Sequence, residues 1–301
     1  MEFYTNILNV IGNTPMLELR NISRGNVFAK AEFLNPGGSI KDRVARYLIE
    51  CAERDGALKP GMTIAEATSG NTGIGVTLVG VHKGYRVVIV MPEDMSEERK
   101  KIIRALGADL ITTPGEKSIA GAVARLKEIL SEDDSIWVVG QFDNPHNPEL
   151  HYSQTAPEVW RQMEGRVDAF VAGVGSGGTL GGVGRFLKEQ DPNIRVVAVE
   201  PKNVSALLGH EPGLHQIQGI GDGFVPAVLD VSLVDEVIEV TDEDAIETTR
   251  LLARKEGALC GTSSGANVWA ALRLADELGP DKNVVTVLPD RAERYFSTAL
   301  I

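Results

Sequence analysis

The chain has 301 residues, of which 43% are apolar and 24% are charged, a composition typical of a globular protein with one large domain or two modest ones. Its 30 basic and 42 acidic residues give a formal net charge of −12, which argues against nucleic acid or an anionic membrane as the main partner. No apolar run approaches the roughly 20 residues that span a bilayer, the first residues do not resemble a signal peptide, and Cys51 and Cys260 make no disulfide framework, so we expect a cytoplasmic protein.

Short apolar and β-branched runs alternate with amphipathic stretches along the whole chain. In chain order, the predicted strands cover residues 27–32, 63–67, 86–91, 109–112, 136–140, 169–172, 195–200, 236–240 and 283–288. The predicted helices cover residues 41–54, 96–106, 120–130, 180–189, 242–256 and 266–278. Several of the strands are almost wholly apolar, as parallel strands are when helices cover both faces of the sheet. The alternation therefore predicts an α/β fold with a mostly parallel sheet.

Some helix ends and a division into lobes also follow from the sequence. Thr241, with Asp244 three residues later, resembles a capping box, and Gly107 and Gly257 lie where helices should end. About nine strands are many for one sheet, so we expect two α/β lobes with a cleft between them. The loop at residues 141–148 (QFDNPHNP) is the predicted crossover between the lobes.

Glycines gather in three clusters, each after a predicted strand and before a helical segment. They lie at residues 35–39 (NPGGS), 69–73 (SGNTG) and 173–179 (GVGSGGT). The first N–H groups of a helix are unpaired and favour negative charge, and glycine lets an anion approach the backbone closely. Three such clusters indicate a ligand with several anionic groups.

The third cluster also spells GxGxxG, with Glu200 at the end of the next strand, which is the dinucleotide-binding pattern. An NAD-dependent oxidoreductase is therefore an alternative, although NAD binding would give no role to Lys41, Asn71 or Ser263. The sequence has no GxxxxGK[ST], so a P-loop is excluded. The five histidines show no metal-ligand spacing, and we expect no metal site.

Lys41 begins a predicted helix directly after the first glycine cluster. A first-turn lysine is often a surface residue, but the positive end of the helix dipole disfavours its charged form. An amine that loses its proton readily suits Schiff-base chemistry. The position alone leaves both interpretations open.

The combination of motifs resembles the cysteine synthase/cystathionine β-synthase family. Its motifs are NPGGSIKDR at 35–43, TSGNTG at 68–73, GSGGT at 175–179 and GTSSG at 261–265, between IGNTP at 11–15 and PDRAERYFS at 289–297. The resemblance covers the whole chain. It implies a two-domain α/β fold of the fold-type II pyridoxal-phosphate enzymes (tryptophan synthase β-like), with mostly parallel sheets and helices on both faces. Residues 36–145 would form the smaller, mobile substrate-binding domain, and residues 1–35 plus 146–301 the larger cofactor-binding domain.

The resemblance also implies pyridoxal 5′-phosphate as cofactor and assigns roles residue by residue. Lys41 matches the Schiff-base lysine and catalytic base, and Asn71 matches the side chain that hydrogen-bonds the 3′ oxygen of the cofactor. Ser263 matches the partner of the pyridine nitrogen. The phosphate loop corresponds to Gly175, Ser176, Gly177, Gly178 and Thr179, and the substrate-carboxylate site to Thr68, Ser69, Thr72 and Gln141.

The implied reaction is β-replacement on a β-substituted alanine, with O-acetylserine and sulfide giving cysteine and acetate through an aminoacrylate. A hydroxyl such as that of Ser263 cannot hold a pyridinium as a carboxylate would, so the ring is a weaker electron sink and prompt loss of a β-substituent is favoured. Cystathionine β-synthase, cysteine desulfhydrase and lanthionine-forming activities remain alternatives within the family. The expected partners are a small amino-acid substrate, a sulfur nucleophile and a second copy of the chain in a homodimer.

Two positions depart from the family pattern. Asp222, in QGIGDGFVP, stands where cysteine synthases commonly have a small apolar residue, so it is either a turn residue or a substrate-site carboxylate that acts on the incoming or departing group. Gln216 stands where relatives often have a lysine. The sequence therefore gives no basic docking surface at this position and leaves open whether a serine acetyltransferase docks on the chain.

Overall fold

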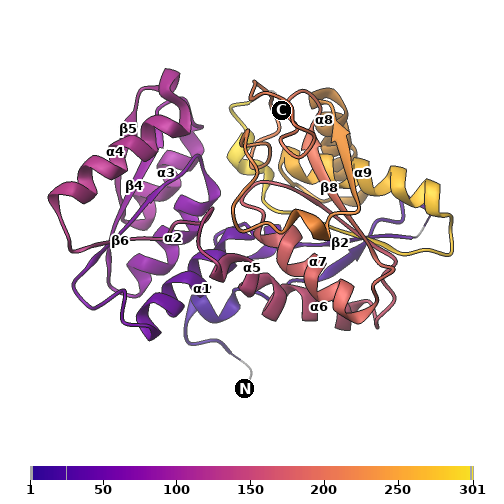
Figure 1. The fold of residues 1–301 in the computed structure, drawn as a ribbon, viewed down its shortest axis with the longest axis horizontal. Coiled ribbons are helices and arrows are strands. Elements are labelled where there is room, and N and C mark those ends of the chain that lie inside the picture. Colours follow the sequence, from indigo (N-terminus) through magenta and orange to yellow (C-terminus); the bar gives the residue numbers. More distant parts are fainter. Residues whose placement is uncertain (1–2, 25, 299, 301) are drawn as a thin grey trace.

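Two α/β lobes make up the computed structural model, which describes residues 3–24, 26–298 and 300 (Figure 1). One lobe is built on a four-stranded sheet and the other on a six-stranded sheet. Each sheet is covered by helices on both of its faces (Figure 1). The α/β fold with mostly parallel sheets is thus confirmed. The expected domain limits include residues 1, 2, 25, 299 and 301, which lie outside the described part of the chain.

The four-stranded sheet is parallel throughout, in the order β5-β4-β3-β6. Its strands are β3 (Thr63–Ala67), β4 (Arg86–Pro92), β5 (Asp109–Thr113) and β6 (Ile136–Val138). One face packs against α1 (Lys41–Arg54), α2 (Asn71–His82) and α3 (Glu97–Leu106). The other face packs against α4 (Ser118–Glu132), through Ala122 and Leu126.

The six-stranded sheet has the order β1-β2-β10-β7-β8-β9, and only the pairing of β1 with β2 is antiparallel. Its strands are β1 (Met16–Glu18), β2 (Val27–Lys30), β7 (Ala169–Gly173), β8 (Arg195–Pro201), β9 (Glu236–Val240) and β10 (Val284–Val287). On one face lie α8 (Asp242–Leu251) and α9 (Thr262–Leu278). On the other lie α6 (Ala156–Gln162) and α7 (Gly178–Gln190), and α5 (His146–Leu150) precedes α6 through a π-helical turn at His151–Thr155.

The nine predicted strands all exist, with ends that differ by at most two residues. The predicted helix at 242–256 is α8 followed by a π-helical turn at Leu252–Glu256, which ends at Gly257 with a φ of +68°. Thr241 caps α8 as predicted, because its hydroxyl accepts a hydrogen bond from the Asp244 N–H. Gly107 ends α3 with a φ of +100°, also as predicted.

Sequence periodicity missed the short strand β1 and the helices α2, α5 and α6. The α2 helix is apolar and glycine-rich and is buried along most of its length, so it has no polar face to produce a helical period. It packs closely on α1, since a Cβ at Gly75 would lie 2.7 Å from the carbonyl oxygen of Lys41. No helix of the described residues is long and apolar enough to cross a membrane.

Candidate active site

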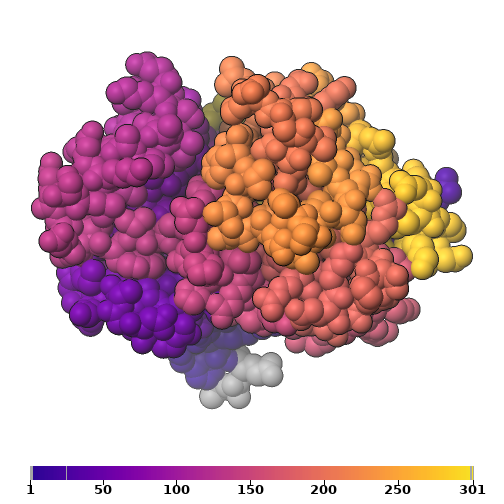
Figure 2. All heavy atoms as spheres, viewed as in Figure 1, coloured from indigo at the N-terminus to yellow at the C-terminus, as the bar shows by residue number. Residues whose placement is uncertain are grey.

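A cavity of about 420 Å³ lies in the cleft between the two lobes. The molecular surface is indented where the magenta and orange regions of the chain meet (Figure 2). The loops that follow β3 and β7 line the cavity from opposite lobes, together with the first residues of α1 and α9. In open parallel sheets, ligands bind beyond the carboxyl ends of the strands, so this cleft is the candidate active site.

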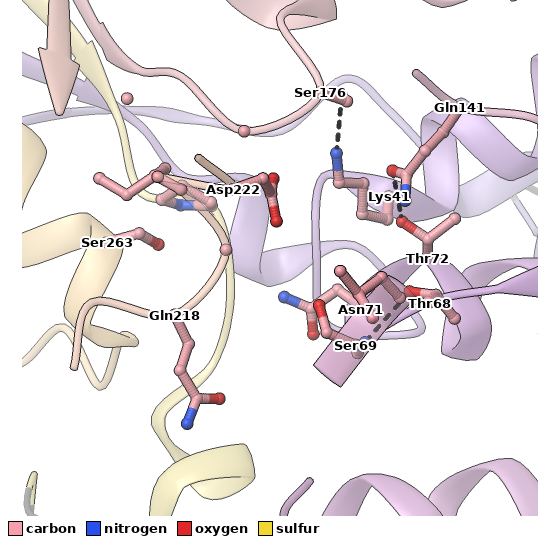
Figure 3. Close-up of a pocket in the computed structure, with 18 of the residues that line it drawn as sticks. Lys41, Thr68, Ser69, Asn71, Thr72, Gln141, Ser176, Gln218, Asp222 and Ser263 are labelled. Atoms are coloured by element: carbon pink, nitrogen blue, oxygen red, sulfur yellow. Dashed lines mark hydrogen bonds between the residues drawn. The ribbon is translucent and has the colours of Figure 1, made fainter. Parts of the chain in front are cut away.

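Lys41 is the first residue of α1, and its amine reaches into the cleft (Figure 3). The amine nitrogen donates a hydrogen bond of 3.1 Å to the Ser176 hydroxyl of the opposite lobe. Burial lowers the pKa of Lys41 from 10.5 to about 8, against the opposing effects of Asp222 and Glu66. A much larger fraction of this amine than of an ordinary lysine is therefore neutral near physiological pH, and a neutral amine can act as a nucleophile or base.

The loop after β3 and the first turn of α2 together place three hydroxyls and one amide on the same side of the cleft as Lys41 (Figure 3). Thr72 donates a hydrogen bond of 2.7 Å to the side-chain oxygen of Gln141, and the N–H of Gly70 donates one of 3.1 Å to Thr68. Ser69 and Asn71 complete the loop. These hydroxyls lie at the N-terminus of α2, where free backbone N–H groups favour an anion such as a carboxylate.

Across the cleft, the loop at 174–178 leads from β7 into α7 and forms a close-packed anion cradle. Gly177 has a φ of +78°, a conformation that favours glycine. A Cβ at Gly175 would lie 2.3 Å from the carbonyl oxygen of Gly219, and one at Gly178 would lie 2.1 Å from the side-chain oxygen of Asn147. The N-terminus of the 13-residue helix α7 faces this cradle, so its N–H groups suit a phosphate.

Buried side chains behind the loop hold it in place. The amide nitrogen of Asn147 donates hydrogen bonds to the Ser176 hydroxyl (3.1 Å) and to the Gln141 carbonyl (2.8 Å). The Thr179 hydroxyl lies 3.3 Å from Nε2 of the buried His151. Sequence reasoning missed Asn147 because an asparagine in a crossover loop resembles an ordinary turn residue.

Glu200, the acidic residue of the dinucleotide-binding pattern, already accepts hydrogen bonds from within the protein. Glu200 is 2% exposed, and one of its carboxylate oxygens accepts hydrogen bonds from the Ser205 hydroxyl (2.6 Å) and the Leu207 N–H (3.0 Å). In a dinucleotide site, this carboxylate would have to be free for the ribose hydroxyls. The structure therefore argues against the NAD-dependent alternative.

Ser263 lies near the start of α9 and faces the cleft from the side opposite Lys41 and Asn71 (Figure 3). It is buried, at 3% exposure. Gly261 is the residue at the N-cap of α9, and no side chain caps that helix. Helix capping therefore does not account for Ser263.

Asp222 projects into the same cleft from a turn between Gly221 and Gly223, both of which have positive φ (Figure 3). Burial raises the pKa of its carboxyl, while Lys41 and His215 act in the opposite direction. Among the described residues, no hydrogen bond to this carboxylate is formed, so it does not cap its own turn as a plain turn residue would. The turn instead directs a carboxylate toward Lys41.

The shape and polarity of the cleft fit pyridoxal phosphate. The cradle at 175–179 suits its phosphate, the Lys41 amine suits its aldehyde, and the Asn71 side chain lines the cleft beside Lys41. The described residues contain no group of three or more metal-ligating side chains. The cofactor-binding and substrate-binding segments predicted from the sequence lie around this one cleft.

Three comparisons with known proteins agree with this geometry. Residues 7–290 match the family described as pyridoxal-phosphate dependent enzyme. Over 299 residues, the chain is 50% identical to a cysteine synthase of Staphylococcus aureus strain Mu50, covering 98% of this chain and 96% of that protein.

Solved structures show the same similarity. O-acetylserine sulfhydrylase isoform 3 from Entamoeba histolytica superposes with a TM-score of 0.94 at 42% identity, over 99% of this chain and 92% of that one. A hydrogen sulfide-producing enzyme from Fusobacterium nucleatum superposes with a TM-score of 0.94 at 40% identity, over 98% of this chain and 100% of that one.

Proposed function

Because this chain belongs to the family of pyridoxal-phosphate dependent enzymes, we propose that it is a cysteine synthase that converts O-acetylserine and sulfide into cysteine and acetate. The observation that carries the proposal is the Lys41 amine with its lowered pKa, which lies between a phosphate cradle and a carboxylate-binding loop. The cysteine synthase from S. aureus and the sulfhydrylase from E. histolytica support the choice of donor and nucleophile.

The proposed cofactor contacts follow from the positions of the side chains. Lys41 would attach pyridoxal phosphate, the loop from Gly175 to Thr179 would hold its phosphate, and Asn71 would hydrogen-bond its 3′ oxygen. Ser263 would face its ring nitrogen. When bound, the cofactor supplies an electron sink that acidifies the substrate Cα–H bond and favours loss of the β-substituent.

Lys41 also moves the proton in this proposal. Its amine, neutral in part near pH 7 because its pKa is about 8, takes the proton from the substrate Cα and later returns it. The Ser176 hydroxyl accepts a hydrogen bond from the amine and fixes its position. Lys41 therefore works as both attachment point and base.

The substrate carboxylate would bind at the loop that begins α2. Thr68 and Ser69 offer hydroxyl donors there, and Thr72, whose hydroxyl donates to the side-chain oxygen of Gln141, holds the Gln141 side chain in the same site. These contacts would orient the Cα–H bond toward the Lys41 amine. We propose that residues 36–145, which include this loop and all four strands of the smaller sheet, move as the substrate-binding domain against residues 1–35 plus 146–301.

Homodimer formation and a cytoplasmic location belong to the same proposal. Exposed apolar side chains near the N-terminus support a subunit interface, namely Phe3, Tyr4, Ile7 and Val10. The free, buried thiols of Cys51 and Cys260 support a reducing compartment. Gln216 is exposed and uncharged, which argues against a basic docking surface for a serine acetyltransferase.

Asp222 supports a second candidate function, in which cysteine is the donor and sulfide is released. Its carboxylate would repel a hydrosulfide anion and could orient a water or an amine near the reacting carbon. The hydrogen sulfide-producing enzyme from F. nucleatum shares the fold at 40% identity. On this proposal Asp222 shifts the balance between the two reactions.

Steady-state rates test the main proposal. With the purified holoenzyme and sulfide, kcat/KM should be higher for O-acetylserine than for O-phosphoserine, serine or cysteine. A higher value for serine with homocysteine would instead assign cystathionine β-synthase activity.

The Asp222→Asn variant tests the second candidate. We expect faster cysteine synthesis and slower sulfide release from cysteine. Asp230→Asn changes an exposed aspartate whose side chain hydrogen-bonds only to Ser232 among the described residues, and it should leave both rates unchanged. An unchanged ratio of the two rates in Asp222→Asn would show that Asp222 has no part in this choice.

A further inference from the structure

Asp290 is a fully buried carboxylate directly behind the active-site cleft, three residues after β10. One of its oxygens, Oδ2, accepts a hydrogen bond of 2.6 Å from the Asn71 amide nitrogen and another from the Tyr295 hydroxyl. The other oxygen, Oδ1, has no hydrogen-bond partner among the described residues. Asp290 therefore joins the C-terminal segment of the larger lobe to the loop that begins α2.

This contact determines which way the Asn71 amide faces. Because Oδ2 of Asp290 accepts the hydrogen bond, the amide turns its NH2 group toward Asp290. The Asn71 NH2 group has two N–H bonds, and one of them donates to Asp290. The second N–H remains available in the cleft, into which Asn71 projects opposite Ser263 (Figure 3).

Tyr295 keeps Asp290 in the role of acceptor. Its side chain is 1% exposed, and burial, followed by the nearby Asp290, raises the pKa of its hydroxyl, so the hydroxyl stays protonated and donates. The Arg99 guanidinium lies 4.8 Å from the centre of the Tyr295 ring and also donates a hydrogen bond to Gln218 at the cleft. The Tyr295 ring is thus held by a contact with Arg99, in addition to the hydrogen bond between its hydroxyl and Asp290.

The position of Asp290 is also fixed by the backbone around it. A Cβ at Gly261 would lie 2.3 Å from Oδ1 of Asp290, so the turn that leads to Ser263 packs directly on the carboxylate. The backbone N–H of Gly261 donates a hydrogen bond of 3.1 Å to the Asp290 carbonyl oxygen. A carboxylate that cannot move is suited to orienting another side chain.

We propose that Asp290 is a positioning residue, which holds the Asn71 amide with an N–H toward the 3′ oxygen of pyridoxal phosphate. The inference rests on the proposed function. A donor at this oxygen stabilises its deprotonated form, whereas an amide carbonyl in the same place would destabilise it. Through the Asn71 amide, Asp290 thereby favours the deprotonated form of the 3′ oxygen without contacting that oxygen itself.

Asp290→Asn tests this inference, because the new amide can donate to Asn71 and allow the Asn71 side chain to flip. We expect the dissociation constant of pyridoxal phosphate, measured by titrating the cofactor-free variant, to rise about fivefold, which corresponds to about 1 kcal/mol. The absorption of the bound cofactor should shift in part from the visible to the near ultraviolet. Ser297→Ala, which removes a hydrogen bond from the C-terminal segment to Glu98 in α3 of the smaller lobe, should change neither property.

A double-mutant cycle separates positioning from a general structural role. In an Asn71→Ala background, Asp290→Asn should change the dissociation constant by less than about twofold, because the residue through which it acts is gone. An equal loss of affinity in both backgrounds would overturn the inference. If Asp290→Asn does not fold, Tyr295→Phe replaces it in the same cycle and should weaken binding only when Asn71 is present.

The outcomes also distinguish this inference from the proposed function. If the wild-type protein binds the cofactor and Asp290→Asn matches it in affinity and spectrum, the inference is wrong and the proposed function stands. If the wild-type protein does not bind the cofactor at all, both are wrong.

Discussion

The lowered pKa of Lys41 can be measured in the cofactor-free protein. With a pKa of about 8 in place of 10.5, the neutral fraction of the Lys41 amine at pH 7 rises from about one in 3,000 to about one in 11, roughly a 300-fold increase. The neutral form is the one that reacts with acylating reagents. The rate of Lys41 acylation should therefore rise with pH to a midpoint near 8.

Removing the nearby carboxylates should move this midpoint downward. Asp222 and Glu66 both raise the pKa of Lys41, against the larger effect of burial. Asp222→Asn and Glu66→Gln should each lower the midpoint below about 8, because each removes a negative charge that stabilises the ammonium.

Competitive labelling with a trace of acetic anhydride, followed by mass spectrometry of the Lys41 peptide, measures the midpoint. The peptide that contains the exposed Lys127 provides the reference for reagent reactivity at each pH. A Lys41 midpoint near 10.5, or a midpoint that rises in Glu66→Gln, would refute the reasoning.

Two further predictions concern the core and the ring-nitrogen site. Arg43 lies 2.7 Å from both Glu32 and Glu158, and Arg43→Ala should lower the free energy of unfolding by about 3–5 kcal/mol in urea denaturation, because it leaves the buried Glu32 carboxylate without an ion-pair partner among the described residues, while Glu158 keeps its ion pair with Lys30. Arg54→Ala, at an exposed pair with Asp55, is the control, and an equal loss in both variants would contradict the prediction. Ser263→Ala should reduce turnover moderately and Ser263→Asp should alter the cofactor spectrum, because a carboxylate stabilises a pyridinium. If neither variant changes kinetics or spectrum, Ser263 does not face the ring nitrogen.

The strands were largely predictable from the sequence because they are buried and apolar. Helices with one polar face, such as α1, could be found from their periodicity. The α2 helix could not, since both of its sides are buried and its glycines allow close contact with α1. The short strand β1 was missed because three half-buried residues carry no usable pattern.

The candidate site was predictable where glycine clusters and chemically distinctive residues coincide, as at Lys41 and the loop at 175–179. The residues behind the site were not predictable in the same way. Asn147, Asp290 and Arg99 act through contacts between segments far apart in the chain, and no local pattern indicates those contacts. Asp290 lies within the PDRAERYFS motif, but the motif gave no indication of its contact with Asn71.

The most direct test of the proposed function is to reduce the holoenzyme with borohydride and to assay it beside Lys41→Ala. The wild-type protein should lose its visible absorption, carry the cofactor mass on the peptide that contains Lys41, and make cysteine from O-acetylserine and sulfide before reduction but not after. Lys41→Ala should fold, gain no such mass and show no more than a trace of this activity. Substantial cysteine formation by Lys41→Ala, or the cofactor mass on a different peptide, would contradict the assignment of Lys41 as the cofactor-binding base.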